Sequence, residues 1–355
     1  MDTEFENDLK LVSKKKPTFP VNELLYSYLK KYNRAINISI QYDDLLRFQG
    51  CVTVYDKNDV DTLWVRCYYA DHERIHIDSD LKKVYDILYS DGNGENLNYL
   101  TIDGVDFCTF GNTKPFRIKI RNILNDGFTY LYIKKADASR IYGLELEHLL
   151  SPHRINFFVC KETLIEEHIA GIPGDEFIAN YMEACEEQEL TQIAKEFVKF
   201  NERCQIRLLG DMRAYNYVII PTHDFDRVSY AIRPIDFDQQ CYEGRLNTYR
   251  PQFFKENVKM VLNVAAKLRN ASIEQYKREE RSLIAKRLAT SQKRYRALIK
   301  CMRADKITTP AKLKMLKSEL YEFSGDMIFK RARNMGGVLQ TALDFIQRNY
   351  AHIKV

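Results

Sequence analysis

Three polar residues in the middle of the chain have types and a spacing that suit phosphoryl-transfer chemistry. Asn216 follows Asp211 by five residues, and Asp236 ends a short apolar run twenty residues later. A carboxylate such as Asp211 can orient a hydroxyl and accept its proton. Amide and carboxylate oxygens, as on Asn216 and Asp236, bind Mg²⁺ on nucleotide phosphates. The segment therefore predicts a site where a phosphoryl group passes to a hydroxyl.

The elements around these residues follow from the hydrophobic pattern. Apolar residues recur at helical spacing over residues 190–204, which predicts a helix directly before the loop. Residues 217–220 predict a strand, residues 221–224 a turn, and residues 228–235 a returning strand that delivers Asp236. A hairpin brings the chain back to its starting point, so we expect all three polar side chains to lie in one cleft.

Further strands are predicted upstream of the loop. Runs rich in β-branched and aromatic residues cover residues 51–55, 63–69, 97–107, 116–124, 128–134, 157–160 and 163–167. Asp126-Gly127 predicts a hairpin turn between the fourth and fifth of these strands. Asp137 predicts the start of a helix that runs to Leu150. Another helix is expected to begin at Asp78 or Ser79, which can cap it, because apolar residues recur at helical spacing over residues 81–88. Residues 74–77 alternate as in a strand.

Composition narrows the class of protein. Of the 355 residues, 45% are hydrophobic and 29% are charged, as in globular proteins. The acidic N-terminus has no apolar segment typical of a secretory signal, and no run is long enough for a membrane span. The eight cysteines form no C-x-x-C pair, which predicts reduced thiols in a cytoplasmic protein.

The charge is distributed unevenly along the chain. Residues 251–355 carry 23 Lys/Arg against 9 Asp/Glu, a net charge of +14, whereas the rest of the chain has a net charge of −9. The last hundred residues, from Phe253 onward, are expected to be almost entirely helical, with breaks near Asn270, at Thr308-Thr309-Pro310 and at Gly336-Gly337. The basic residues either solvate exposed helix faces or bind an anionic partner.

The order of these segments resembles the protein-kinase-like superfamily, and within it small-molecule kinases such as aminoglycoside phosphotransferases and choline kinases. The resemblance covers roughly residues 97–260 and rests on a five-strand region, the break Gly171-Ile172-Pro173-Gly174, a helix, the D-x4-N loop, a hairpin and Asp236-Phe237-Asp238. It implies an α+β, bilobal protein-kinase-like fold with a β-rich N-lobe and a helical C-lobe.

The resemblance also implies site residues in the N-lobe. Leu131-Tyr132-Ile133-Lys134 is similar to the V-A-I-K strand, which makes Lys134 the expected ligand of the nucleotide phosphates, with Lys135 as the alternative. On the following helix Glu145 is the expected partner of this lysine, and Glu147 is the alternative. Residues Glu167, His168 and Ile169 are similar to the hinge between lobes, where the backbone pairs with the adenine of ATP.

In the C-lobe the resemblance makes Asp211 the catalytic aspartate, and Asn216 and Asp236 the ligands of Mg²⁺. Arg213 lies where a cation can steady the transferring phosphoryl group, although it can equally pair with a carboxylate. Asp238 replaces the glycine of the D-F-G motif and is a candidate for a second metal ligand.

Two further departures from the family pattern stand out. The residues before the catalytic aspartate are Leu209-Gly210, where the family usually has a histidine that braces the loop. The strands before Lys134 lack a G-x-G-x-x-G phosphate loop, and the only loose candidates are Gly104, Gly111 and Asn112. Together with the missing A-P-E segment, these departures favour a small-molecule kinase over a protein kinase.

The sequence thus predicts four parts: a flexible leader (1–20), a small α+β unit of unknown role (21–95), a kinase-like N-lobe (96–170) and a kinase-like C-lobe with a basic helical extension (171–355). The expected function is ATP- and Mg²⁺-dependent transfer of phosphate to a hydroxyl of a small, sugar-like or anionic molecule. The alternative is a catalytically weak pseudokinase or scaffold that binds protein or nucleic acid. An acidic or nucleic-acid partner on the basic helices is the less favoured hypothesis.

Overall fold

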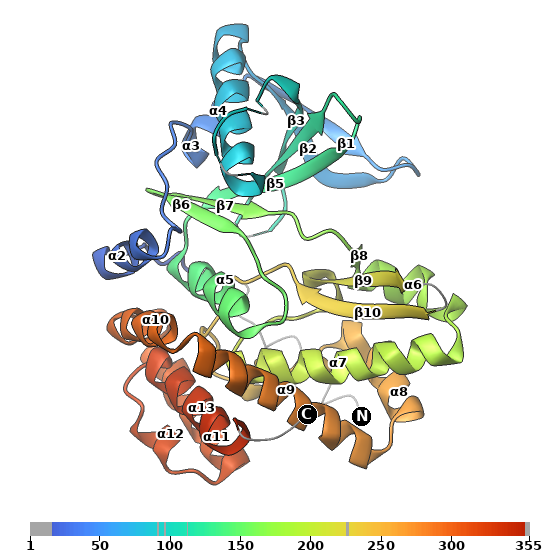
Figure 1. The fold of residues 1–355 in the computed structure, drawn as a ribbon, viewed down its shortest axis with the longest axis vertical. Helices are drawn as coiled ribbons and strands as arrows, with labels where there is room; N and C mark the ends of the chain where they lie inside the picture. The colour runs from blue at the N-terminus through green and yellow to red at the C-terminus, as the bar shows by residue number, and fades with distance from the viewer. Residues whose placement is uncertain (1–15, 91, 96, 112, 225–226, 352–355) are drawn as a thin grey trace. The chain divides into compact units, whose positions relative to one another are not determined.

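The chain divides into two compact units. The computed structural model describes residues 16–90, 92–95, 97–111, 113–224 and 227–351 (Figure 1). The unit rich in strands, here called the strand unit, comprises residues 20–137 and 155–168. The helical unit comprises residues 1–19, 138–154 and 169–355. Each unit is described separately below.

A seven-stranded antiparallel sheet forms the centre of the strand unit (Figure 1). Its spatial order is β1 (Gly50–Tyr55), β2 (Asp61–Tyr68), β3 (Leu100–Cys108), β4 (Phe116–Asn122), β5 (Phe128–Lys135), β7 (Thr163–Glu167) and β6 (Phe157–Cys160). The alternation predicted for β4 is confirmed, because its apolar side chains are buried in the core and its basic ones lie on the opposite face. The α+β class and the seven predicted strands are likewise confirmed.

The boundary expected at residue 95 runs through this sheet. Strands β1 and β2 come from residues 21–95, and β2 pairs with β3 from the next predicted part through Trp64–Cys108, Val65–Phe107 and Arg66–Asp106. The pattern of residues within a strand does not reveal which strand it pairs with. Residues 21–95 therefore contribute to the same sheet and to the same core as the strands that follow.

Helix α4 (Asp71–Tyr89) packs on one face of the sheet. It begins seven residues before the expected start, so the prediction that residues 74–77 are strand-like was wrong. Ile77, Leu81, Val84 and Leu88 follow one another at intervals of four, three and four residues and join the sheet's core. An ion pair of 2.7 Å between Arg74 and Asp78, one helical turn apart, supports the first turns. The strand unit also contains α2 (Glu23–Lys31), α3 (Tyr42–Leu45) and a 3₁₀ turn, η1 (Leu97–Tyr99).

The helical unit begins with α5 (Ala138–Leu150), which starts directly after Asp137 as predicted. A second sheet has the order β10 (Arg227–Pro234), β9 (Tyr217–Asp224) and β8 (Ile172–Pro173). The turn expected at residues 221–224 is instead the last part of β9, because the ladder continues to the pair Asp224–Arg227. Helix α7 (Glu187–Arg207) precedes the loop that carries Asp211. Helix α6 (Gly174–Asn180) begins at the last residue of the predicted break at residues 171–174, and η2 (Met182–Ala184) follows it before α7.

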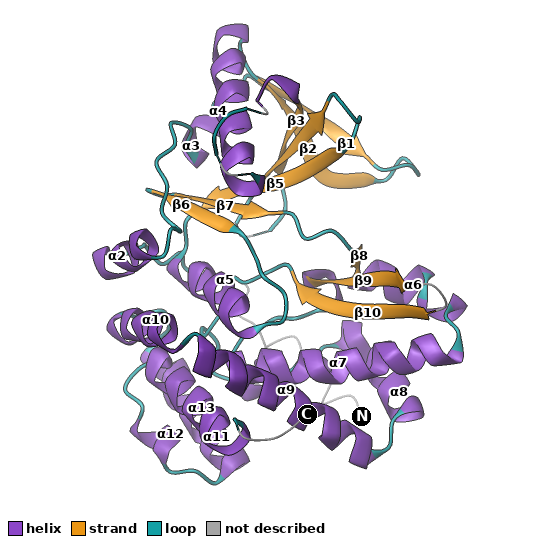
Figure 2. Cartoon of the chain, in the orientation of Figure 1, coloured by secondary structure: helices purple, strands orange, loops and turns teal. Residues whose placement is uncertain are grey.

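Beyond Pro234 the described chain forms helices and loops without a further strand (Figure 2). After the 3₁₀ turns η4 (Leu246–Tyr249), η5 (Pro251–Phe253) and η6 (Lys255–Asn257) come α8 (Val258–Lys267), α9 (Asn270–Thr290), α10 (Gln292–Ala304), α11 (Pro310–Ser324), α12 (Ile328–Arg331) and α13 (Met335–Tyr350). The break predicted at Gly336-Gly337 lies instead just before α13. A Cβ on Gly336 would come within 2.5 Å of the Met302 backbone, so this glycine allows α13 to pack closely against α10.

Residues 1–15 of the expected leader lie outside the described residues. Its last residues belong to the fold, because the carbonyl of Phe19 accepts a hydrogen bond of 2.8 Å from the Ala138 N–H at the start of α5. Within the described part of the chain, no helix combines the length and the apolar character needed to cross a membrane.

Candidate functional site

The loop that carries Asp211 is fixed by its backbone. Leu208, the cap of α7, and Asp211 both adopt the left-handed conformation, with φ of 55° and 59°. The Gly210 N–H donates to the carbonyl of Gln239 (3.3 Å), and the Asp211 N–H donates to the carbonyl of Thr248 (3.1 Å). These backbone bonds hold the loop in place directly before and at Asp211.

Asn216 connects the two aspartates predicted for the site. Its side-chain amide donates a hydrogen bond of 2.7 Å to the carbonyl of Asp211. Its own carbonyl accepts from the N–H of Ile235 (3.0 Å) and of Asp236 (3.4 Å). The structure therefore brings Asp211, Asn216 and Asp236 together. Asp211 and Asn216 lie just before β9, and Asp236 lies just after β10. Their chemical roles stay predictions.

Arg213 pairs with the carboxylate of Asp211. Its Nε donates to Asp211 Oδ1 (2.9 Å), and its Nη1 donates to Glu256 Oε1 (2.8 Å). The guanidinium also lies 5.1 Å from the ring centre of Phe254. Pairing with a carboxylate is thus what Arg213 does in this structure, and an action on a transferring phosphoryl group stays a prediction.

The environment of Asp211 favours its protonated form near neutral pH. Burial raises the pKa of the Asp211 carboxyl to about 7, although the charge and hydrogen bond of Arg213 act in the opposite direction. The negative charges of Asp236 and Glu256 contribute to the raised pKa of Asp211 in the same direction as burial. A carboxyl with a pKa near 7 suits a group that takes and returns a proton at physiological pH.

Asp236 and Asp238 share one arginine, Arg140 on α5. Arg140 Nη1 lies 2.8 Å from Asp236 Oδ1 and 2.7 Å from Asp238 Oδ1, and Nη2 donates to the carbonyl of Ile235 (3.3 Å). Arg140 is only 1% exposed, whereas one third of the Asp236 side chain is exposed. The sequence analysis missed Arg140. An arginine on an otherwise apolar stretch of helix was the one signal that could have indicated it.

The donor atoms fit a hard cation with few protein ligands. The bond from Asn216 to Asp211 uses the amide nitrogen and not the amide oxygen, and Asp236 lies next to it with a partly exposed side chain. No group of three or more His, Cys, Asp or Glu side chains in the described residues is arranged for a metal ion. Mg²⁺ is commonly held by one or two carboxylates and completed by phosphates and water, so Asn216 and Asp236 could hold it with a nucleotide.

In the strand unit Lys134 forms a buried ion pair with Glu166. Lys134 Nζ lies 3.0 Å from Glu166 Oε2, and both side chains are less than 10% exposed. Lys135 points to the other face, as strand alternation requires, and pairs with Glu162 at 3.5 Å near solvent. Sequence analysis did not identify Glu166, because it lies opposite Tyr132 on a neighbouring strand and not on the following helix.

The two glutamates expected as partners of the lysine are paired within the helical unit. Arg294 on α10 donates to Glu145 Oε1 (2.6 Å), and Arg207 on α7 forms a buried pair with Glu147. Lys134 belongs to the strand unit, so the predicted pair of Lys134 and Glu145 spans two units and stays a prediction.

The chain crosses from one unit to the other within the expected hinge. It leaves the strand unit after His168 and enters the helical unit at Ile169. The N–H groups of Glu167 and His168 are already engaged: they donate to the carbonyl of Asn156 (3.1 Å) and to the Tyr89 hydroxyl (3.2 Å). The His168 ring packs against Tyr130 and Tyr132. Pairing of this segment with adenine stays a prediction.

Two of the three candidates for a phosphate loop can be placed. Gly104 lies within strand β3, where an added Cβ would come within 2.4 Å of the Arg66 guanidinium, so this glycine serves packing. Gly111 lies in the loop between β3 and β4 with a φ of 88°. Asn112 lies outside the described residues.

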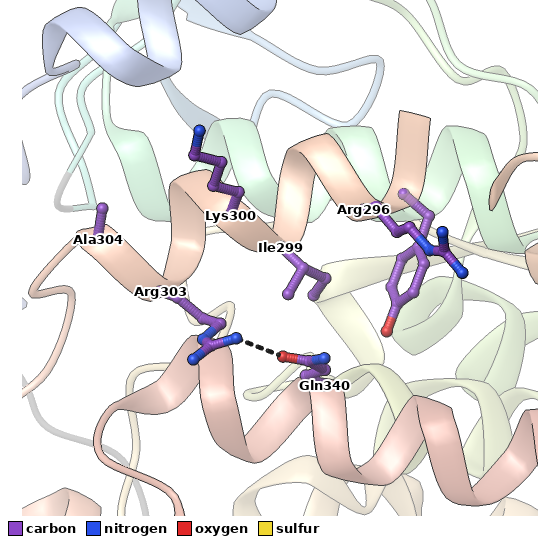
Figure 3. A pocket seen from close by; sticks show the side chains of 7 residues that line it. Arg296, Ile299, Lys300, Arg303, Ala304 and Gln340 are labelled. Carbon is purple, nitrogen blue, oxygen red and sulfur yellow. Dashed lines mark hydrogen bonds between the residues drawn. The ribbon is translucent and has the colours of Figure 1, made fainter. Parts of the chain in front are cut away.

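A separate cavity of about 490 Å³ lies between α10 and α13 (Figure 3). Arg296, Lys300 and Arg303 line it from α10, and Gln340 lines it from α13. Arg303 donates to Gln340 (3.2 Å), whereas Lys300 points to the opposite side of α10 (Figure 3). These cations do not converge on one point, and no residue of the Asp211–Asn216 loop lines the cavity.

No protein-family model matches the chain, and no curated protein matches it. The resemblance to kinase-like proteins therefore rests on the residues and on the order of the elements.

Proposed function

We propose that the protein is a phosphotransferase that uses ATP and Mg²⁺ to phosphorylate a hydroxyl of a small molecule. The observation that carries the proposal is the position of Asn216, whose side chain binds the Asp211 backbone while its own backbone binds Ile235 and Asp236. This contact supports the proposal, because it brings a carboxylate that could accept a proton close to two side chains whose oxygens could hold a hard cation.

The order of the elements supports the same proposal. Five strands, β3 to β7, precede the break at Gly171–Gly174, and α7, the Asp211 loop, the β9–β10 hairpin and Asp236 follow it. This is the order on which the resemblance to small-molecule kinases rests. Lys134, at the end of β5, is assigned to the nucleotide phosphates by that resemblance alone.

In the proposed reaction each of these residues has its own role. Asp211 binds the acceptor hydroxyl and takes its proton. Meanwhile the hydroxyl oxygen forms a bond to the γ-phosphorus. The bond between the γ-phosphorus and the β–γ bridging oxygen breaks, which releases ADP. Asn216 and Asp236 would hold Mg²⁺, which when bound neutralises charge on the phosphate oxygens. Arg213 steadies the Asp211 carboxylate and, through it, the position of the acceptor.

A second candidate function is a binding scaffold without catalysis. It is favoured by one observation: arginines already pair with all three site carboxylates, Arg213 with Asp211 and Arg140 with Asp236 and Asp238. Such pairing suits a site whose carboxylates serve the fold. The two functions differ in whether ATP is consumed.

The deciding experiment measures ADP formation by the purified full-length protein with MgATP and a panel of hydroxylated small molecules, including sugars and amino alcohols. We expect at least one acceptor to stimulate ADP formation and Asp211→Asn to abolish the stimulation. Asp224→Asn, an exposed aspartate at the end of β9, is the matched control and should keep full activity. Turnover that survives in Asp211→Asn would refute the assignment of Asp211, and no turnover with any acceptor would favour the scaffold.

A further inference from the structure

We propose that Arg140 is a built-in counter-cation of Asp236 and Asp238. It holds both carboxylates in place and lowers their affinity for a divalent metal ion that arrives without a nucleotide. This inference rests on the proposed function, because it concerns the same candidate metal site. It makes Arg140 a positioning residue that acts through Asp236.

The first support is the set of hydrogen bonds and packing contacts that residues near the start of α5 make with residues 235–240. Arg140 reaches two carboxylates and the Ile235 carbonyl with one guanidinium. The neighbouring Ser139 hydroxyl lies 3.2 Å from the carbonyl of Asp238 and 2.8 Å from that of Gln240. One turn further on, a Cβ on Gly143 would lie 3.0 Å from the Cβ of Phe237, so glycine at this position favours the close approach of the helix.

The second support is the burial of the arginine charge. Arg140 is 1% exposed, and the Asp238 N–H donates to the same Asp236 oxygen that Arg140 binds (3.0 Å). The guanidinium therefore cannot turn out to solvent to make way for another cation without breaking several hydrogen bonds at once. Arg140 therefore compensates part of the negative charge of Asp236, whose side chain is partly exposed to solvent.

The consequence for metal binding follows from electrostatics. A divalent ion beside Asp236 is repelled by the fixed charge of Arg140, and water screens this repulsion only weakly at a buried group. A nucleotide brings several negative charges with the metal, and these outweigh the single charge of Arg140. The arrangement therefore favours the metal–nucleotide complex over the metal alone.

A purely structural role for Arg140 makes the opposite prediction. If Arg140 only anchors residues 235–240 to α5, its loss disorders Asp236 and weakens metal binding. If it is a counter-cation, its loss removes a repulsive charge and strengthens metal binding. The sign of the change in metal affinity separates the two roles.

The experiment measures Mn²⁺ binding to the full-length protein by electron paramagnetic resonance, without nucleotide and with ATP. Arg140→Gln keeps hydrogen-bond donors but removes the charge, and we expect it to bind Mn²⁺ alone about tenfold more tightly than the wild type. Arg303→Gln removes an arginine from α10, whose partner is Gln340, and should leave Mn²⁺ binding unchanged. Unchanged or weaker binding of Mn²⁺ by folded Arg140→Gln would overturn the inference.

Arg140→Lys keeps the experiment decisive if Arg140→Gln does not fold. Lysine preserves the charge, so Mn²⁺ affinity should stay within about threefold of the wild type. A fall of about tenfold or more would show that the geometry of the guanidinium, and not its charge, is what matters. The wild type with ATP tests the proposed function separately: no Mn²⁺ binding even with ATP contradicts that function, whereas ATP-dependent binding with no increase in Arg140→Gln contradicts only the counter-cation.

Discussion

The Asn216 side chain donates a 2.7 Å hydrogen bond to the carbonyl of Asp211, five residues earlier in the chain. Asn216 is only 9% exposed, so water cannot easily replace the bond. This contact closes the loop between α7 and β9 and helps to keep it in a defined shape.

Loss of this bond should destabilise the protein. We expect Asn216→Ala to lower the free energy of unfolding by about 1 kcal/mol, because the Asp211 carbonyl loses one buried donor and keeps the hydrogen bond from the Arg213 N–H (2.8 Å). Urea unfolding followed by circular dichroism measures the change. Asn180→Ala, at the exposed end of α6, is the control and should change the free energy by less than about 0.5 kcal/mol. Equal effects of the two variants would show that the bond contributes little.

Asp211 should make the stability fall as the pH rises. The folded state has the higher pKa for this carboxyl, about 7 against an ordinary value of 3.8. The folded state therefore retains a proton that the unfolded chain has released, and the resulting stabilisation is complete below about pH 4 and is lost as the pH rises through about 7.

Asp211→Asn removes this titration. Relative to the wild type, the free energy of unfolding of Asp211→Asn should increase by about 2 kcal/mol between about pH 5 and about pH 8. The loss of the ion pair between Arg213 and Asp211 in the variant adds an offset that does not depend on pH, so the difference between the two pH values isolates Asp211. A constant difference across this range would show that the pKa of Asp211 is not raised.

The buried pair of Lys134 and Glu166 should be strongly coupled. Lys134→Met and Glu166→Leu should each lower the free energy of unfolding by about 3 kcal/mol, because each removes one member of a buried ion pair. The double variant should recover part of the loss, as measured by a double-mutant cycle in urea. Lys135→Met breaks only an exposed pair and should cost less than about 1 kcal/mol. Additive effects of the two buried substitutions would contradict the coupling.

Much of the fold could be predicted from local pattern. The alternation in Phe116–Asn122 and the helical spacing before Arg207 identify their elements because each has one buried face. The pairing of β2 with β3 could not be predicted, since β-strand patterns do not encode partners. The early start of α4 was missed because Ile75 and Ile77 alternate with Arg74 and His76 over too short a stretch to separate strand from helix.

The candidate site divides in a similar way. The grouping of Asp211, Asn216 and Asp236 could be predicted because a short hairpin must return the chain to its starting point. Arg140 and Glu256 could not be predicted, because each meets its partner through contacts between residues that lie about 40 to 100 positions apart in the chain. Glu166 was hidden for the same reason, since strand pairing brings it to Lys134.

A thermal unfolding measurement shows whether Asp236 belongs to a site for a metal–nucleotide complex. ATP should raise the Tm of the full-length protein when Mg²⁺ is present and not when EDTA replaces it, because only a ligand that prefers the folded state stabilises it. The Mg²⁺-dependent increase should disappear in Asp236→Asn and remain in the control variant Asp224→Asn. An ATP-induced increase in Tm that persists both in EDTA and in Asp236→Asn would show that Asp236 does not belong to such a site. The absence of any increase in the wild type at saturating ATP and Mg²⁺ would show the same.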